Sequence, residues 1–229
     1  DRVQAVLPPA ATLILRTDNP EKPPPAHGNI LLDRLAGAEL VWITPDEYKE
    51  RQKVFDREVR RLQENGRKPY VIPEGGSNQL GAWGYVFCME EIGGDLKKLD
   101  GESYKRTTVL SATGSGGTTA GLLLGAKLLE LDHDVVGVNV CDDRDYFVKI
   151  VSEICTKFIN DYRQDIVVNS ASDINIVDGY VGRGYALSRP EELQAIYELA
   201  RQEGVILDPV YTGKAFYGMI SEIKKRKEV

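Results

Sequence analysis

LSATGSGGTTAG, residues 110–121, is the stretch that decides how this sequence is expected to fold. It joins a short β-rich segment to a long apolar one through a glycine-rich loop. Glycine lets a backbone turn tightly and approach a ligand closely. At the start of a helix, successive backbone N–H groups then converge on an anion, which the helix dipole also favours. The stretch therefore predicts a strand, a phosphate-binding loop and a helix.

The loop does not carry the common nucleotide motifs. A Walker loop needs a lysine after its last glycine, and no lysine follows Gly116 or Gly117. The dinucleotide fingerprint needs a further glycine where this sequence has Thr119. These departures exclude ATP or GTP hydrolysis by a Walker loop and weaken a dinucleotide site. A glycine-rich turn that binds nothing stays open at this point.

Outward from this loop, apolar strands alternate with helices. Strands are predicted over 12–15, 39–43, 69–72, 107–110, 135–140 and 205–207. Helices are predicted over 29–36, 45–64, 85–92, 120–131, 146–162 and 190–203, with a last helix after 209–214. Loops are predicted over 18–27, 93–102 and 178–185, and Thr44 is the expected N-cap of the helix that starts at Pro45. This alternation is typical of βαβ units, so we expect an α/β fold with parallel sheets.

Composition narrows the function classes. The 229 residues are 42% hydrophobic and 28% charged, enough for a buried core, and their net charge is −6. An acidic chain is a poor candidate for binding nucleic-acid phosphates or an anionic membrane surface. No transmembrane segment or secretory signal is visible, and three cysteines without CxxC spacing favour a reducing, cytoplasmic compartment. With two histidines, no metal site is expected.

Two further segments carry polar groups. The segment GGSN, 75–78, follows an expected strand and precedes a helix, where Ser77 or Asn78 could also serve only as a cap. The segment DPVYTGK, 208–214, places Tyr211 on a loop after another expected strand. Such a tyrosine is either an acid–base group or an ordinary half-buried aromatic, and the residues alone leave both open.

Four sequence blocks together resemble the pyridoxal-phosphate enzymes of the tryptophan-synthase-β fold, fold type II. The blocks are GNILLDRLAGAE (28–39), GRKPYVIPEGGSNQLGAWGY (66–85), ATGSGGTTAGL (112–122) and EGVILDPVYTGKAFYGMI (203–220). They are most similar to the group that contains D-cysteine desulfhydrase and 1-aminocyclopropane-1-carboxylate deaminase. The resemblance implies pyridoxal phosphate as cofactor, a homodimer, and two open twisted parallel-sheet domains of three layers, over 1–78 and 79–229.

The resemblance also implies roles for residues at matching positions. The phosphate loop of the family matches Thr113, Gly114, Ser115, Gly116, Gly117 and Thr118. Tyr211 and Tyr185 match two active-site tyrosines. Ser77 and Asn78 match a motif on the substrate side of the cleft. Thr212 matches the position that faces the pyridine nitrogen of the cofactor.

Thr212 discriminates within this group. Cyclopropane-opening deaminases resemble one another in having glutamate at this position. Thr212 makes this sequence similar to the D-cysteine desulfhydrases, which have threonine there. A neutral hydroxyl gives a weaker electron sink than a carboxylate, and β-elimination tolerates this because the leaving group departs from the carbanion. The resemblance implies α-proton removal from D-cysteine, loss of sulfide, and release of pyruvate and ammonia.

Several other functions stay open beside this one. Within the enzyme class, the alternatives are cyclopropane deamination and L-cysteate sulfo-lyase activity. Outside it, the chain could be a non-catalytic phosphate- or nucleotide-binding module, or a scaffold that only packs against a partner subunit. Release of ammonia or sulfite from each amino acid would distinguish the enzymes, and failure to bind any phosphate ligand would favour the scaffold.

The sequence departs from the family pattern at the cofactor lysine. That lysine belongs to a GNKxRK-like motif, but here Asn29 is followed by Ile30, and Lys214 lies in the wrong motif. The QSN-like and HTGG-like segments of the family have no match either, and the first residue is Asp1. We therefore expect an internal piece of a longer enzyme, with exposed sheet edges. It should be nearly inactive alone, because it has no lysine to bind the cofactor or carry the α-proton.

Overall fold

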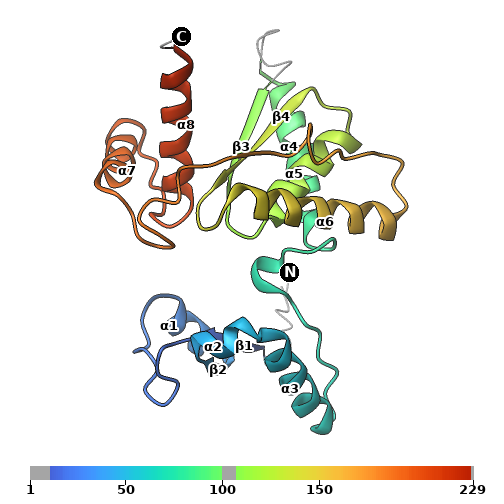
Figure 1. Ribbon diagram of the computed structural model, residues 1–229, viewed down its shortest axis with the longest axis vertical. Coiled ribbons are helices and arrows are strands. Elements are labelled where there is room, and N and C mark those ends of the chain that lie inside the picture. Colours follow the sequence, from blue (N-terminus) through green and yellow to red (C-terminus); the bar gives the residue numbers. More distant parts are fainter. Residues whose placement is uncertain (1–10, 100–106, 228–229) are drawn as a thin grey trace, which may run out of the picture. The chain divides into compact units, whose positions relative to one another are not determined.

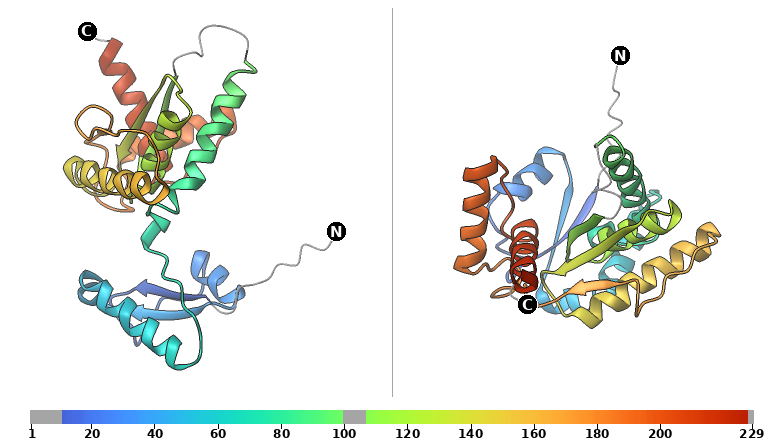
Figure 2. Two further views of the ribbon diagram at one scale, coloured as in Figure 1. Left: turned by 90° about the vertical axis from the view of Figure 1, so that its right-hand side faces the viewer. Right: turned by 90° about the horizontal axis from the view of Figure 1, so that it is seen from above.

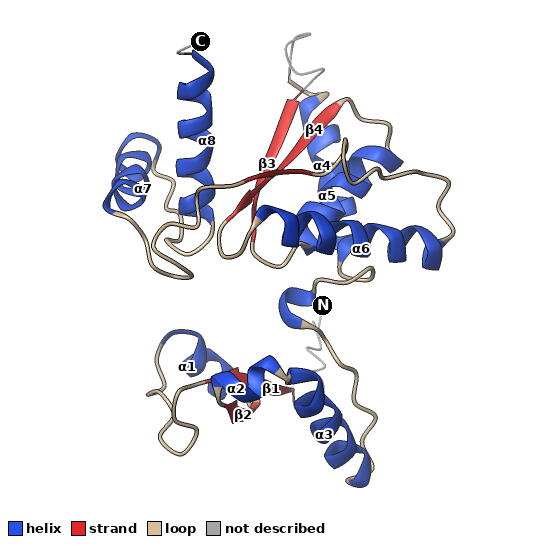
Figure 3. Cartoon of the chain, in the orientation of Figure 1, coloured by secondary structure: helices blue, strands red, loops and turns tan. Residues whose placement is uncertain are grey.

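The computed structural model describes residues 11–99 and 107–227, so the end of the loop predicted at 93–102 lies outside the described residues. The chain divides into two compact units, one ending at Val71 and the other beginning at Ile72. Figure 1 labels the helices and strands of each unit, and Figure 3 distinguishes them by colour. Both units combine helices with a parallel sheet, as the alternating pattern predicts.

The first unit is built on a parallel pair of strands. Its elements are β1 (Thr12–Arg16), α1 (Gly28–Leu35), β2 (Glu39–Ile43), α2 (Pro45–Lys49) and α3 (Arg51–Glu64). Thr12 of β1 pairs with Glu39 of β2, so α1 lies in the crossover that parallel strands require. Ile43 and Val54, which are 1% and 4% exposed, are buried apolar side chains of this unit.

Helix capping explains where α2 begins. The Thr44 hydroxyl accepts a hydrogen bond from the Glu47 N–H at 3.2 Å, and the Glu47 carboxylate accepts one from the Thr44 N–H at 2.9 Å. This capping box confirms the predicted N-cap. The single helix predicted over 45–64 is wrong, because Glu50 leaves helical geometry (φ −106°, ψ 31°) and separates α2 from α3.

The second unit is built around the sheet β3-β4-β5. Its elements are η1 (Glu74–Gly76), α4 (Ala82–Leu96), β3 (Thr107–Thr113), α5 (Gly117–Leu128), β4 (His133–Asn139), α6 (Arg144–Tyr162), β5 (Asn175–Val177), α7 (Pro190–Glu203) and α8 (Thr212–Lys227). Helices α4, α5 and α6 lie on one side of the sheet, and α8 with α7 beside it lies on the other, which gives three layers (Figure 1 and Figure 2). Within the described ranges, no helix is both long and apolar enough to cross a bilayer.

Burial on both faces explains the apolar sequence of β4. Val135 packs into the core beneath α4, α5 and α6, where Phe147 and Phe158 are fully buried. Val138 points to the opposite face and packs with Tyr180 and with Ala215 of α8. A strand that is covered on both faces has a continuous hydrophobic sequence, which is why it could be predicted.

Two of the predicted strands are wrong. Residues 69–72 and 205–207 are neither strand nor helix. Apolar side chains in both segments face solvent, with Tyr70 69% exposed and Ile206 85% exposed. Such composition favours a pleated, half-buried surface, but a strand also needs a neighbour, and no described strand pairs with either segment.

Other elements differ in their boundaries. Strand β3 ends at Thr113 and α5 begins at Gly117, so the loop between them is shorter than predicted. Helix α4 continues to Leu96, so the helix predicted to end at residue 92 is longer and the loop predicted from residue 93 begins later. Strand β5 was not predicted, because three residues are too few to show the alternation of a strand.

Two glycines set the distance between α4 and α5. A Cβ on Gly121 would lie 2.5 Å from the Ala82 carbonyl oxygen, and a Cβ on Gly125 would lie 2.6 Å from the Cβ of Met89. Real Cβ atoms do not approach other atoms so closely. The two helices therefore pack backbone against backbone, which brings the turn before α4 close to the loop before α5.

We expect Gly125→Ala to destabilise the second unit, because overpacking a tight contact costs about 1–3 kcal/mol. Gly84→Ala in α4 is the matched control, since nothing lies within 4 Å of a Cβ at that position and alanine favours a helix. Urea unfolding of both variants measures the difference. Equal stability of the two variants would contradict a tight contact at Gly125.

Candidate functional site

A cavity of about 780 Å³ lies along β3 and the loop that follows it. Its lining includes residues that the sequence singles out as site candidates: Gly114, Ser115, Thr118, Tyr185, Tyr211 and Thr212. Leu110, Ala112 and Phe216 add apolar surface to it. The glycine-rich loop and the segment 208–214, which are far apart in the sequence, thus meet at one cavity of a size for a small molecule.

The loop between β3 and α5 has the geometry of an anion cradle. Gly116 has a φ of +85°, a left-handed conformation that favours glycine, and α5 begins at the next residue. The first N–H groups of a helix have no partner within it and stabilise an anion. A Cβ on Gly114 would lie 3.1 Å from the Tyr211 ring, so this glycine lets the loop approach the tyrosine.

Ser77 joins the turn before α4 to this loop. Its hydroxyl donates to the Ser115 hydroxyl at 2.7 Å and accepts a hydrogen bond from the Gly117 N–H at 3.2 Å. A Cβ on Gly117 would lie 2.6 Å from the Ser77 oxygen, and a Cβ on Gly75 would lie 2.5 Å from the Ser115 oxygen. The two glycine-rich turns therefore form one continuous polar surface.

Five of the predicted site residues are outside the cavity lining: Ser77, Asn78, Thr113, Gly116 and Gly117. Two of these, Thr113 and Asn78, make local hydrogen bonds. Thr113 is 1% exposed, and its hydroxyl shares a hydrogen bond of 2.8 Å with the Thr119 hydroxyl. The side-chain oxygen of Asn78 accepts a hydrogen bond from the Gly81 N–H at 2.8 Å, just before α4 begins. A direct role of Thr113 or Asn78 toward a ligand stays a prediction.

Tyr185 and Tyr211 meet at their hydroxyl groups. The two oxygens are 2.5 Å apart, and the ring planes are inclined by 67°. Burial and the hydrogen bond with Tyr185 raise the pKa of Tyr211 well above its ordinary value. Tyr211 therefore stays a protonated, neutral phenol at neutral pH, with Tyr185 as its hydrogen-bond partner.

Asp208, which the sequence analysis did not single out, holds the turn that carries Tyr211. Its carboxylate accepts hydrogen bonds from three backbone N–H groups at 2.7–2.9 Å, those of Val210, Tyr211 and Thr212. It also accepts one from the Thr212 hydroxyl. Burial raises the pKa of this carboxyl, but the hydrogen bonds outweigh burial and the pKa lies below its ordinary value. An aspartate before a helix start is a frequent cap, and this signal could have identified it.

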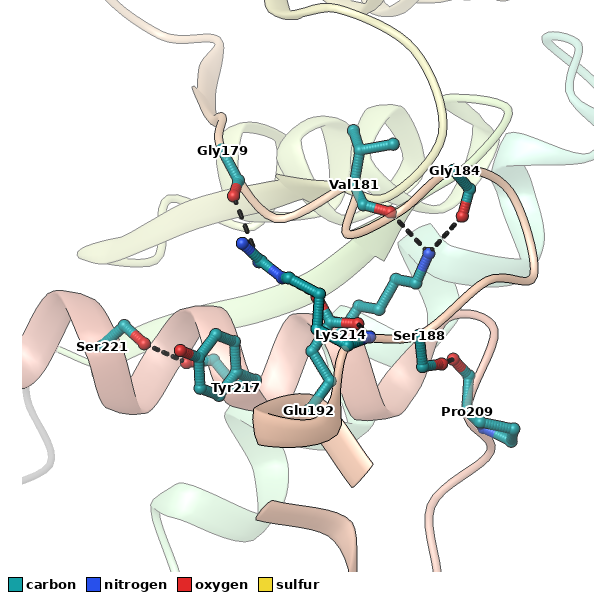
Figure 4. A network of polar contacts seen from close by, with 10 residues as sticks. Gly179, Val181, Gly184, Ser188, Glu192, Pro209, Lys214, Tyr217 and Ser221 are labelled. Atoms are coloured by element: carbon teal, nitrogen blue, oxygen red, sulfur yellow. Dashed lines mark hydrogen bonds and ion pairs between the residues drawn. The ribbon is translucent and has the colours of Figure 1, made fainter. Parts of the chain in front are cut away.

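The described residues supply no lysine to the lining of the cavity. Lys214 follows Thr212 in α8, but its side chain is fully buried. Its ammonium group donates to the carbonyl oxygens of Val181 and Gly184 at 2.6 and 2.7 Å (Figure 4). Because its ammonium group is bonded to these carbonyls outside the cavity lining, Lys214 is not in position to bind a cofactor there.

The site fits the phosphate end of pyridoxal phosphate. The left-handed Gly116 and the start of α5 provide an anion cradle, and Ser115 and Thr118 bring hydroxyl groups to the same cavity. Glycine is needed at Gly75 and Gly117, where a Cβ would fill this space. These residues, and not a lysine, are the groups that the described chain offers to such a cofactor.

Together, the three-layer fold and the anion cradle define a phosphate-binding α/β protein. The chain belongs to the pyridoxal-phosphate dependent enzyme family, whose family model matches residues 6–229. This match confirms the family and the cofactor that the four sequence blocks predict.

Known relatives agree with this assignment. A Thermotoga maritima protein named "Putative 1-aminocyclopropane-1-carboxylate deaminase" is 43% identical over 203 residues, which are 88% of this chain and 62% of that protein. The Arabidopsis thaliana "Bifunctional D-cysteine desulfhydrase/1-aminocyclopropane-1-carboxylate deaminase, mitochondrial" is 41% identical over 217 residues, 93% of this chain and 52% of that protein. This chain therefore spans between half and two thirds of the length of these relatives.

A solved structure confirms the predicted fold. The crystal structure of an ACC deaminase homologue matches with a TM-score of 0.78 and 32% sequence identity. The match covers 95% of this chain and 62% of that chain. The fold is therefore the tryptophan-synthase-β-like fold, fold type II, that the sequence blocks predict.

We expect Gly75→Ala to weaken binding of pyridoxal phosphate about tenfold or more, because its Cβ would displace Ser115 from the cradle. Gly76→Ala is the matched control, since Gly76 has a similar φ of +61° but open space around it. Fluorescence titration with pyridoxal phosphate measures both affinities. If Gly76→Ala weakens binding as much, backbone strain and not the contact with Ser115 is responsible.

We expect acid to weaken the second unit through Asp208. A carboxyl whose pKa is lowered by folding contributes stability above its unfolded pKa and loses it as the pH falls through the folded pKa. The free energy of unfolding should therefore decline as the pH falls below the ordinary value of 3.8, and Asp208→Asn should lack this part of the decline. Urea unfolding over a pH series measures it, with the exposed Asp165→Asn as control. Identical pH profiles of the wild type and Asp208→Asn would contradict this role.

Proposed function

We propose that this chain forms the cofactor-binding part of a carbon–sulfur lyase that converts D-cysteine to pyruvate, ammonia and sulfide. The observation that carries the proposal is one cavity that joins the phosphate loop to the paired hydroxyls of Tyr185 and Tyr211 and to Thr212. The names of the relatives, which include both D-cysteine desulfhydrase and cyclopropane deaminase activities, support a reaction of this class.

Thr212 supports the desulfhydrase over the deaminase. It is a neutral side chain at a position where the family resemblance implies glutamate in the deaminases, and its hydroxyl donates to the Asp208 carboxylate. The neutral hydroxyl of Thr212 carries no negative charge that would hold a proton on a nearby ring nitrogen. Pyridoxal phosphate, when bound, supplies the electron sink for a carbanion, and Thr212 leaves that sink weak.

The tyrosine pair supports elimination of sulfide. Because the pKa of Tyr211 is raised, by burial first, this residue keeps its proton at neutral pH and is a neutral hydrogen-bond donor. The phenol, backed by Tyr185, can donate a hydrogen bond to the sulfur that departs while it keeps its own proton. The glycine-rich loop holds the phosphate, so that the substrate is oriented toward the tyrosines.

We expect the complete protein with pyridoxal phosphate to release sulfide and ammonia in equal amounts from D-cysteine. Tyr211→Phe should slow sulfide release about 100-fold or more, since loss of a hydrogen-bond donor to developing negative charge costs that much. Tyr197→Phe is the control, because Tyr197 is an exposed tyrosine of α7 that does not line the cavity. Sulfide detection and an ammonia assay measure the rates.

The same assay tests the alternatives. Ammonia from 1-aminocyclopropane-1-carboxylate without sulfide from D-cysteine would replace the proposal with the deaminase reading. Sulfite from L-cysteate would favour the sulfo-lyase. Binding of pyridoxal phosphate by the complete protein without turnover of any of these amino acids would favour a non-catalytic phosphate-binding module.

We also propose that the protein is a homodimer in a reducing, cytoplasmic compartment. The three cysteines Cys88, Cys141 and Cys155 are free thiols, which supports such a compartment. Burial raises the pKa of Cys155 to about 12, so this residue stays an inert thiol. Sedimentation of the complete protein would measure its oligomeric state.

A further inference from the structure

Lys214 is a buried cation with an unusual set of partners. Its side chain is fully buried, and both of its hydrogen-bond acceptors are neutral backbone carbonyls, those of Val181 and Gly184. Glu192 lies near Lys214 (Figure 4). Its carboxylate accepts hydrogen bonds from the Arg189 N–H and guanidinium at 2.7 and 2.9 Å. Burial of an ammonium group is costly unless it is well hydrogen-bonded. A cation in this place therefore calls for an explanation beyond packing.

The two carbonyls belong to the segment that leads to Tyr185. This segment, residues 181–187, has no helix or strand and contains two glycines with positive φ, Gly182 at +75° and Gly184 at +133°. Within it, the Arg183 N–H donates to the Leu187 carbonyl at 3.1 Å and the Leu187 N–H donates to the Gly184 carbonyl at 3.0 Å. Because the segment has few hydrogen bonds of its own, contacts with other parts of the unit must hold it in place. Lys214 makes two of these contacts.

Lys214 also lies close in sequence to Tyr211, the hydrogen-bond partner of Tyr185. Tyr211 immediately precedes α8, and Lys214 lies three residues later in the first turn of that helix. One rigid element thus holds Tyr211 directly and holds the Tyr185 segment through the Lys214 ammonium. The two attachments lead to the two tyrosines whose hydroxyl oxygens are 2.5 Å apart.

We propose that Lys214 is a positioning residue, which fixes residues 181–187 to the start of α8 and thereby sets the Tyr185 hydroxyl against Tyr211. Its hydrogen bonds are charge-assisted, which makes them stronger than bonds from a neutral donor. An effect of Lys214 on catalysis rests on the proposed function, whereas its effect on the position of the Tyr185 hydroxyl does not. The experiment therefore measures the segment and the tyrosine pair, and not turnover.

Hydrogen exchange tests the attachment in this chain. In Lys214→Met, the amides of residues 181–187 should exchange about tenfold faster or more, because two charge-assisted bonds are lost. Amides of α5 should be unchanged. Lys225→Met is the matched control, since Lys225 is a lysine of the same helix that bonds Glu222 and Tyr180 near the surface. Faster exchange throughout the second unit, or none in the segment, would overturn the proposal.

A fluorine signal tests the effect on the tyrosine pair, which a purely structural lysine would leave unchanged. With 3-fluorotyrosine at position 211, Tyr185→Phe removes the hydroxyl partner and shifts the ¹⁹F resonance. Lys214→Met should reproduce that shift, and Lys225→Met should not. A Lys214→Met resonance equal to that of the unsubstituted protein would refute the positioning role, whatever happens to stability.

Two further measurements test the proposal if Lys214→Met does not fold. Lys214→Gln keeps a donor and much of the side-chain volume, and should give an intermediate exchange rate and shift. The unsubstituted chain provides a test without any variant: the amides of Arg183 and Leu187 should be as protected as the first turn of α8. If they exchange as fast as amides of an exposed loop, the segment is not held and the proposal fails.

Discussion

The contact of the Ser77 hydroxyl with Ser115 and with the Gly117 N–H is the constraint on which the rest of the site depends. It requires two glycine-rich turns to approach within hydrogen-bond distance, and glycine at Gly75 and Gly117 is what permits that approach. The close packing of α4 on α5 at Gly121 and Gly125 also keeps the turn before α4 near the loop before α5. Helix packing and ligand cradle are thus two results of one short separation between neighbouring segments.

A second organising element is the short segment 208–214. Asp208 holds the backbone of the turn, Tyr211 faces the phosphate loop, Thr212 lines the cavity, and Lys214 reaches the segment before α7. These groups reach different partners because Asp208 and Tyr211 lie in the turn, whereas Thr212 and Lys214 lie at the start of α8. One stretch of seven residues therefore connects the cavity, the tyrosine pair and the loop behind it.

The site divides its work between two kinds of group. Backbone N–H groups and hydroxyls of the glycine-rich loop offer sequence-independent binding of an anion, which suits a cofactor phosphate. The tyrosine pair and Thr212 offer neutral hydroxyl groups, which can donate hydrogen bonds without adding negative charge. Family membership agrees with the first set, and the proposed lyase reaction is an argument from the second.

The sequence by itself determined the α/β alternation, the anion loop and the cap at Thr44, because each follows from patterns among residues a few positions apart. It also determined the family, because four such blocks between residues 28 and 220 occur together. Only the tertiary structure decided that 69–72 and 205–207 are not strands and that β5 is one, since pairing depends on what lies beside a segment. It also decided that Thr113 and Asn78 bond locally, and that Asp208 and Lys214 hold the tyrosines. The physical reason is range: helix periodicity and capping act over three or four residues, whereas Lys214 finds its acceptors 30 and 33 residues away in the sequence.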